Sequence, residues 1–223
     1  MHQTTGIVLP IPAKECSVTR LREVYGPSDE NTARRQLYFG AVTVPPGRTR
    51  GLDFGSLECV AILISGSAGL SWNDQNTHIS AAPEGCWALR TGPCTTFRIE
   101  ACAEPAEAIL VRAESVLHDE QTHAELQGPV PSHWLRPSWS RIIVSQQRAI
   151  QGATDAITLP WAGQGTCEGL MHVRFSSGSG YAVVTDLGVR AYHGDTVIIP
   201  VDAHDIKVSV SEDATLVFAG LLL

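Results

Sequence analysis

Short apolar runs recur along the whole chain, and turn-forming residues separate them. The runs are rich in Val, Ile, Thr and Tyr, which favour the extended backbone of a pleated sheet. Gly, Pro, Asn or Asp clusters end the runs, as in the stretches at 44–47 and 176–180. This spacing predicts strands at Gln36–Val44, Cys59–Ser65, Cys86–Arg90, Thr96–Ala101, Ala108–Ala113, Arg141–Val144, Ala156–Leu159, Leu170–Phe175, Tyr181–Thr185, Thr196–Ile199, Ile206–Val210 and Thr215–Ala219.

One stretch interrupts this strand pattern near the middle of the chain. Ala113–Gln127 contains helix-forming residues and neither Gly nor Pro, so it predicts a helix, and the Pro-rich Gly128–Trp139 predicts an ordered linker. We therefore expect an all-β protein with an N-terminal barrel over residues 1–113, a helix and linker over 114–139, and a C-terminal barrel over 140–223. Residues 7–24 are expected to add edge strands.

The two halves of the chain resemble each other. Residues 84–101 align with residues 193–206 on a shared glycine, Gly85 with Gly194, and this places Thr95 where the later copy has His204. The stretch 58–72 is matched with 179–192, and the closing runs AILVRA (108–113) and ATLVFA (214–219) also correspond. The order of strands thus predicts two related domains, of which the second has kept chemistry that the first has lost.

Composition excludes several classes of function. The 223 residues carry a formal net charge of −7 without a Lys/Arg-rich cluster, which argues against nucleic acid or an anionic membrane as a partner. No run approaches the roughly 20 continuous apolar residues of a membrane helix. The first residues lack the basic and apolar regions of a signal peptide, and none of the six cysteines forms a C-x-x-C pair. We expect a cytoplasmic protein with reduced cysteines.

The stretch His193–Ile206 reads Gly-Asp, an apolar strand, a Pro corner and then a His. Together with the repeated strand order, it resembles the cupin superfamily in its duplicated, bicupin form. The resemblance covers roughly residues 35–113 and 140–220. It implies a small jelly-roll barrel for each half and a homodimer, or close packing of the two halves.

The first half departs from the cupin metal motif. The family has a His-x-His pair and a Glu in its first motif, and a His in its second. Here the region of the His pair contains Asp53 and no His, Glu58 or Cys59 stands at the Glu position, and Thr95 stands at the last His position. Two carboxylates would hold a transition metal only weakly, so we expect none there.

The second half keeps more of the motif. His172 and Arg174 stand where the His-x-His pair is expected, and His204 fits the second motif. Two imidazoles facing one barrel would hold a divalent metal (Fe, Mn, Ni or Zn) together with a carboxylate or water. Strand alternation gives Arg174 the same face as His172, which equally suits an anion pocket with a His as general acid or base. Tyr181 is the candidate proton donor and Trp161 a candidate substrate contact.

Each of these residues also has a purely structural interpretation. His204 would be a surface residue at a strand end, and His172 a hydrogen-bonded core residue. Arg174 would be a surface charge if the strand register were opposite to the one assumed. Trp161 would be a packing anchor.

Three hypotheses about function remain open at this point. The first is an isomerase, epimerase, cyclase or lyase that acts on a small, anionic organic molecule through His-based or metal-assisted chemistry in the C-terminal barrel. The second is a non-catalytic bicupin that binds a small ligand or a partner. The third, an iron-dependent oxygenase, requires three His ligands where the chain offers two.

Overall fold

The computed structural model describes residues 7–9, 20–25, 37–82, 86–115, 123–130, 139–160 and 168–222. Most of them lie in strands of four antiparallel sheets, and the helical element among them is a 3-10 turn, η1 (Thr185–Leu187). In these parts of the chain no helix has the length and apolar character needed to cross a membrane. The all-β fold class is confirmed.

The N-terminal barrel consists of two sheets. The six-stranded sheet has the order β11-β8-β5-β10-β3-β2, and the four-stranded sheet has the order β4-β9-β6-β7. Their strands are β2 (Arg20–Tyr25), β3 (Leu37–Val44), β4 (Thr49–Leu52), β5 (Leu57–Ser65), β6 (Ser67–Trp72), β7 (Gln75–Ser80), β8 (Cys86–Thr91), β9 (Phe97–Ala101), β10 (Ala106–Glu114) and β11 (Ala124–Val130).

The C-terminal barrel repeats this plan. Its five-stranded sheet has the order β1-β17-β14-β19-β12, and its four-stranded sheet has the order β13-β18-β15-β16. Their strands are β1 (Ile7–Leu9), β12 (Ile142–Ala149), β13 (Thr154–Thr158), β14 (Gly169–Phe175), β15 (Tyr181–Val184), β16 (Val189–Tyr192), β17 (Thr196–Ile199), β18 (Asp205–Val210) and β19 (Ala214–Leu221).

The sheet orders establish which strands correspond in the two halves. The run β8-β5-β10-β3 matches β17-β14-β19-β12, and β4-β9-β6-β7 matches β13-β18-β15-β16. The expected duplication is therefore present. The alignment of Gly85 with Gly194 agrees with this order, because β8 and β17 follow these glycines. The match of 58–72 with 179–192 is wrong by one strand, since β5 and β6 correspond to β14 and β15.

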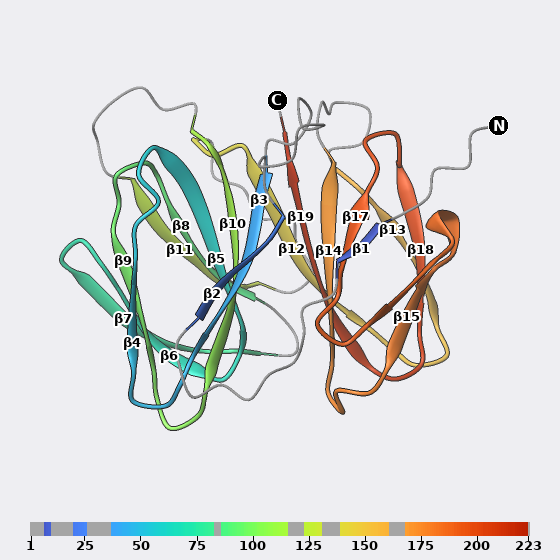
Figure 1. The fold of residues 1–223 in the computed structure, drawn as a ribbon, viewed down its shortest axis with the longest axis horizontal. Helices are drawn as coiled ribbons and strands as arrows, with labels where there is room; N and C mark the ends of the chain where they lie inside the picture. Colours follow the sequence, from blue (N-terminus) through green and yellow to red (C-terminus); the bar gives the residue numbers. More distant parts are fainter. Residues whose placement is uncertain are drawn as a thin grey trace.

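The four sheets form four successive layers, with the two large sheets face to face at the centre of the molecule (Figure 1). Each barrel encloses an apolar core, and a third core lies between the barrels. On β10, for example, Ala108 and Leu110 face the core of the N-terminal barrel, whereas Ile109 and Val111 face the other barrel. Both faces of the large sheets are thus buried, which explains their nearly continuous apolar runs.

The predicted strands are all found, with shifts of a few residues at their ends. The predicted edge strands near the N-terminus are also found, and they join different sheets: β2 pairs with β3, whereas β1 pairs with β17 of the C-terminal barrel. Strands β4, β7 and β11 were absent from the sequence prediction, and β6 and β16 were expected only as the second strands of the matched stretches 58–72 and 179–192.

The helix expected over Ala113–Gln127 is wrong at both ends. Residues 113 and 114 end β10, and residues 124–127 belong to β11, which pairs with β8; residues 116–122 lie outside the described residues. Ala124 and Leu126 pack against the core of the N-terminal barrel. This alternating burial outweighs the helix propensity of the segment, since propensity is a weak preference that tertiary packing overrides.

Candidate functional site

The interior of the C-terminal barrel is apolar where the sequence predicted a site. On β14, the side chains of Met171, Val173 and Phe175 belong to the barrel core. The alternate residues, His172 and Arg174, therefore face the N-terminal barrel. The expectation that they face the cavity of their own barrel is wrong, because a one-residue difference in register moves every side chain of a strand to the other face.

His172 is buried between the two barrels. Its ring lies 5.9 Å from the ring of Phe39, a residue of the N-terminal barrel, and its Nδ1 is 3.1 Å from Oγ1 of Thr196. Burial, and then the nearby His193 and Arg174, lower the pKa of His172 to about 3. The imidazole is therefore neutral at physiological pH and occupies a packing position.

Arg174 links the two barrels. Its guanidinium donates hydrogen bonds to the carbonyl oxygen of Ile64 (3.0 Å) and to Oγ of Ser65 (2.7 Å), and it lies 3.4 Å from the carboxylate of Glu107. All three partners belong to the N-terminal barrel. The guanidinium thus holds the two large sheets together, in a place where the sequence analysis expected an anion anchor.

His204 lies on the exposed loop between β17 and β18. Its carbonyl oxygen accepts a hydrogen bond from the backbone N–H of Leu159, and its side chain lines an open pocket of about 330 Å³. Three carboxylates, those of Asp186, Asp202 and Asp205, also line this pocket. The structure therefore does not bring His204 together with His172, which faces the other barrel.

Tyr181 also lies outside the barrel interior. Ala182 and Val184 point into the core, so Tyr181 lies on the outer face of the four-stranded sheet, where the guanidinium of Arg190 is 4.4 Å from its ring centre. The expected role of Tyr181 as a proton donor inside the barrel conflicts with this orientation. Trp161, the expected substrate contact, lies outside the described residues.

The Gly-Asp pair of the second motif forms a turn. Gly194 has a φ of +84°, which favours glycine, and the Asp195 carboxylate accepts a hydrogen bond from the backbone N–H of Tyr192 at 2.8 Å. Burial raises the pKa of Asp195, although that hydrogen bond opposes the shift. Nδ1 of His193 accepts the backbone N–H of Phe175. The Asp195 side chain thus bonds within the turn and the His193 side chain bonds to the backbone of β14, which explains the motif without a ligand.

A polar row crosses the interior of the N-terminal barrel instead. Tyr38 pairs with Arg112, Arg112 pairs with Cys59, and Cys59 pairs with Thr91 across four adjacent strands. Cys59 belongs to the barrel core, and alternation on β10 gives Arg112 the same inward face. The row lies at one end of the barrel, because β3 and β5 begin there and β8 and β10 end there. We call this end the mouth.

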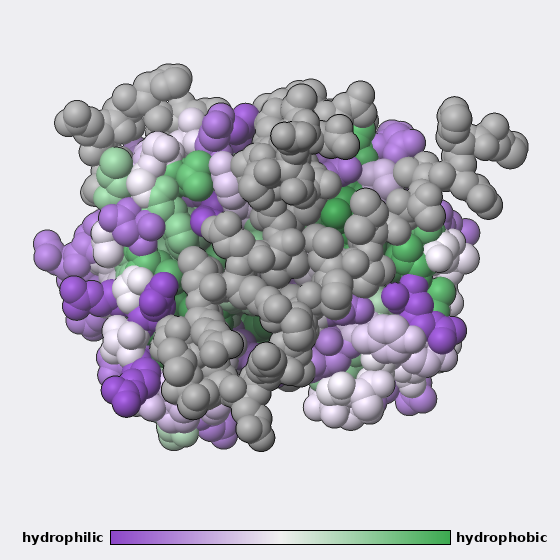
Figure 2. Space-filling model, viewed as in Figure 1, coloured by the Kyte–Doolittle hydropathy of each residue, from purple (hydrophilic) through white to green (hydrophobic). Residues whose placement is uncertain are grey.

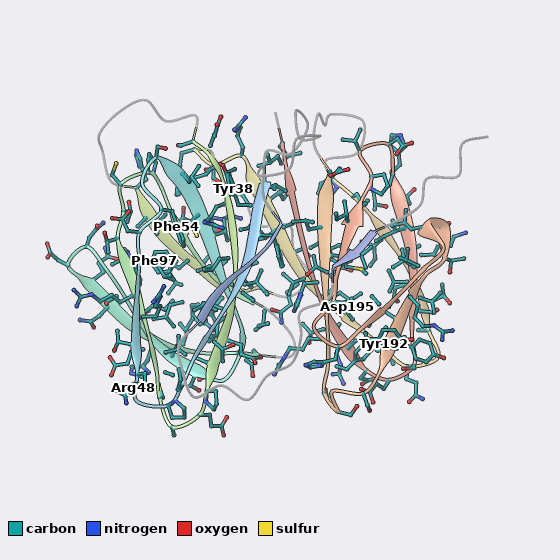
Figure 3. The ribbon with its side chains drawn as sticks, viewed as in Figure 1. Tyr38, Arg48, Phe54, Phe97, Tyr192 and Asp195 are labelled. Atoms are coloured by element: carbon teal, nitrogen blue, oxygen red, sulfur yellow. The ribbon has the colours of Figure 1, made fainter. Side chains whose placement is uncertain are left out.

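Aromatic rings flank the Arg112 guanidinium at the mouth. Its central carbon is 4.7 Å from the ring centre of Phe54 and 5.3 Å from that of Tyr38. Phe54 in turn lies 6.3 Å from Phe97, and Figure 3 shows these three aromatic residues gathered in one half of the barrel. Arg112 is only 5% exposed. A guanidinium carries its N–H donors in its own plane, which is the plane in which a carboxylate binds.

Cys59, which carries the thiol of the row, stays neutral. Burial raises the pKa of its thiol, and the positive charge of Arg112 opposes the shift only in part. A protonated thiol is a poor nucleophile and a poor metal ligand. The row thus combines one cation with neutral hydroxyl, thiol and aromatic groups.

The other residues considered in the first half have structural partners. Asp53 accepts hydrogen bonds from the backbone N–H of Gly55 and from Oγ1 of Thr96, and it shapes the loop between β4 and β5. Glu58 faces the other barrel, where its carboxylate accepts the backbone N–H of Arg141. Burial raises the pKa of Glu58, although this bond and nearby charges oppose the shift. Thr95 is buried and donates to the carbonyl oxygens of Pro93 and His123.

Sequence reasoning missed Arg112 as a candidate. The signal was present: Arg112 lies within the apolar run AILVRA (108–113), and it shares a strand face with Ala108 and Leu110. A charge in register with inward-facing apolar residues indicates a buried cation. The matching residue in the closing run of the second half, Phe218, packs in the core of the C-terminal barrel.

Comparisons with known proteins agree on the fold. No family model matches the sequence, and no curated protein is significantly similar to it. Among solved structures, GK1651 from Geobacillus kaustophilus superposes with a TM-score of 0.70 at 11% identity, covering 97% of this chain and 95% of that chain. The bacterial pirin YhhW from Escherichia coli, in complex with nickel(II), gives 0.69 at 8% identity, covering 98% and 99%. A cupin 2 conserved barrel domain protein from Leptotrichia buccalis gives 0.54 at 13%, covering 96% and 92%.

The nickel in one of these structures raises the question of a metal here. Among the described residues, no group of three or more His, Cys, Asp or Glu side chains could hold a metal ion. The expected ligands, His172 and His204, lie between the barrels and on an exposed loop, and the thiol in the polar row is protonated. The described donors therefore do not fit a divalent metal.

Proposed function

Because the chain has the two-barrel fold of cupin proteins, we propose that it is a binding protein for a small aromatic carboxylate, held at the mouth of the N-terminal barrel. The observation that carries this proposal is the inward position of Arg112. Its guanidinium would bind the carboxylate in its plane, and the rings of Tyr38 and Phe54 would contact the aromatic body of the ligand.

The asymmetry of the repeat supports this location. Arg112 in the first half corresponds to Phe218 in the second, so only the first of these two matching strands directs a cation into its barrel. The sequence analysis relied on a different asymmetry, Thr95 against His204. Because Thr95 bonds to carbonyl oxygens and His204 is exposed, that difference is weaker support for a site.

The isomerase, epimerase, cyclase and lyase reactions expected from the sequence need His172, His204 and Tyr181 in one cavity. These side chains lie between the barrels, on a loop and on an outer face. Binding without these residues, the second of the three hypotheses, is therefore the function that the geometry supports best. Its ligand keeps the anionic character that was expected of the substrate.

Thermal unfolding with benzoate as the probe tests the proposal. Benzoate should raise the melting temperature of the wild type, because it binds the folded state alone, whereas the uncharged benzyl alcohol should not. Arg112→Met should remove the benzoate effect, and Arg48→Met, a change at the opposite end of the same barrel (Figure 3), should keep it.

A second variant tests the proposal in case Arg112→Met does not fold. Phe54 is partly exposed, so Phe54→Leu should fold and should bind benzoate more weakly through the loss of ring contact. A benzoate effect that survives in folded Arg112→Met, or an absence of any effect in the wild type, would contradict the proposal.

A further inference from the structure

A groove follows strand β6 on the outer face of the four-stranded sheet in the N-terminal barrel. Ala68, Leu70 and Trp72 point into the core, so the alternate residues face outward. These outward residues are Ser67, Gly69 and Ser71, all of them small. The neighbouring strands β7 and β9 carry longer outward side chains, so β6 forms the floor of the groove.

The walls of the groove come close to its floor at Gly69. A Cβ atom at this position would lie 3.6 Å from Nε2 of His78 on β7 and 3.8 Å from Cβ of Glu100 on β9. In the register of the sheet, Gly69 pairs with both residues. The space above Gly69 is thus occupied by these two side chains, and the open part of the groove lies farther along β6, at Ser71.

The groove deepens into an open pocket of about 590 Å³ near the turn between β6 and β7. Arg98, Ser71 and Asn76 pair across the three strands and form one row of its lining. Hydrophilic residues gather over this edge of the molecule (Figure 2). The complete lining is Ser71, Trp72, Asn73, Asp74, Gln75, Asn76, Cys94, Thr96 and Arg98.

The side chains of this row are available to a ligand. Within the described part of the chain, the side chains of Arg98, Ser71 and Asn76 make no hydrogen bond or ion pair. A guanidinium has five donors in a fork that matches a carboxylate, and amide and hydroxyl groups both donate to and accept from hydroxyl groups. One cation beside a set of amides and hydroxyls therefore suits a molecule that carries one carboxylate and several hydroxyls.

The charges of the pocket narrow the choice of ligand. Asp74 also lines it, so the formal charges of the lining, with Arg98, cancel. A multiply charged anion such as a phosphate ester would be repelled by Asp74 and by the net charge of −7. We propose that this groove binds a polyhydroxylated monocarboxylate, that is, a sugar acid, with Arg98 on the carboxylate and Ser71 and Asn76 on hydroxyls. This site is separate from the proposed site at Arg112.

Galacturonate is the probe for the test, with galactose and acetate as partial analogues. In amide NMR spectra of the full chain, galacturonate should shift the signals of residues 71–76 and 94–98, and the shifts should saturate at millimolar concentrations. Galactose lacks the carboxylate and acetate lacks the hydroxyls, so each should bind more weakly than galacturonate. Benzoate should leave these signals unchanged, which separates this site from the mouth of the barrel.

Two arginine variants make the assignment specific. Arg98→Met should weaken galacturonate binding about tenfold, the effect of losing one carboxylate–guanidinium contact. Arg48→Met, another exposed arginine of the same barrel but outside the lining, should bind as the wild type does. Shifts that do not saturate, shifts centred elsewhere, or equal losses in the two variants would overturn the proposal, whatever the result with Arg112.

Discussion

The buried imidazole of His172 should make the stability of the protein depend on pH. In the unfolded chain this group binds a proton below its ordinary pKa of 6.5, whereas in the folded protein burial lowers the pKa to about 3. Between these values the unfolded state binds more protons, so the free energy of unfolding falls as the pH falls. The contribution is fully present above pH 6.5 and is lost progressively as the pH falls toward 3.

The size of this effect follows from the shift. Each pH unit between the two pKa values changes the free energy of unfolding by about 1.4 kcal/mol. From the ordinary pKa of 6.5 down to about pH 5, His172 alone should therefore cost about 2 kcal/mol. Other groups titrate in the same range, so the effect is isolated by comparison with a variant that cannot titrate at this position.

His172→Asn is that variant, because its side-chain amide can reach Oγ1 of Thr196 as Nδ1 of the imidazole does. Urea unfolding of the wild type and the variant, at about pH 7 and about pH 5, gives the two pH dependences. We expect the variant to be less stable at neutral pH, because part of a buried ring is lost, and to lose about 2 kcal/mol less on acidification.

His204→Asn is the matched control, because this imidazole is exposed. It should keep the pH dependence of the wild type. Equal pH dependences for the wild type and His172→Asn would refute the conclusion that His172 is buried and neutral between the barrels.

Two further predictions concern the backbone and the contact between barrels. Gly66→Ala should destabilise the protein by more than about 2 kcal/mol in urea unfolding, because the φ of Gly66 is +75° and the new Cβ would lie 2.2 Å from the carbonyl oxygen of Pro105. Gly152 has a similar φ of +78° but lies in open space, so Gly152→Ala should cost only about 1–2 kcal/mol. Arg174→Met should cost about 1–3 kcal/mol by the same assay, because it removes two hydrogen bonds between the barrels. Arg148 forms an exposed ion pair with Asp213, so Arg148→Met should cost less than about 1 kcal/mol. Equal costs within either pair would contradict the stated cause.

The local pattern of residues was sufficient to predict most of the strands. Apolar β-branched runs between Gly and Pro clusters depend on neighbours in the sequence, and the strands predicted at 36–44 and 196–199 are present in the structure as β3 and β17. The duplication could be inferred for the same reason, since in both copies of the sequence a glycine, Gly85 or Gly194, precedes a short apolar run. The expected resemblance to cupins is confirmed at the level of the fold.

The tertiary structure decided which face of each strand points inward. In β14, apolar residues (Met171, Val173 and Phe175) alternate with His172 and Arg174, which separates the two faces of the strand. Because both faces are buried, this alternation does not show that the polar face lies between the barrels and not in the barrel interior. The packing of two large sheets against each other places His172 and Arg174 between the barrels.

The tertiary structure also decided in which barrel the candidate site lies, because it sets which side chains face each barrel interior. Arg112 lies within an apolar run, and only its pairing with Tyr38 and Cys59 shows that it belongs to an inward-facing row. The strand β11 likewise depends on β8, a partner distant in sequence, which outweighs a local preference for helix. The positions of most strands are local properties of this sequence, whereas the face and partner of each strand depend on long-range pairing. The candidate site depends on both.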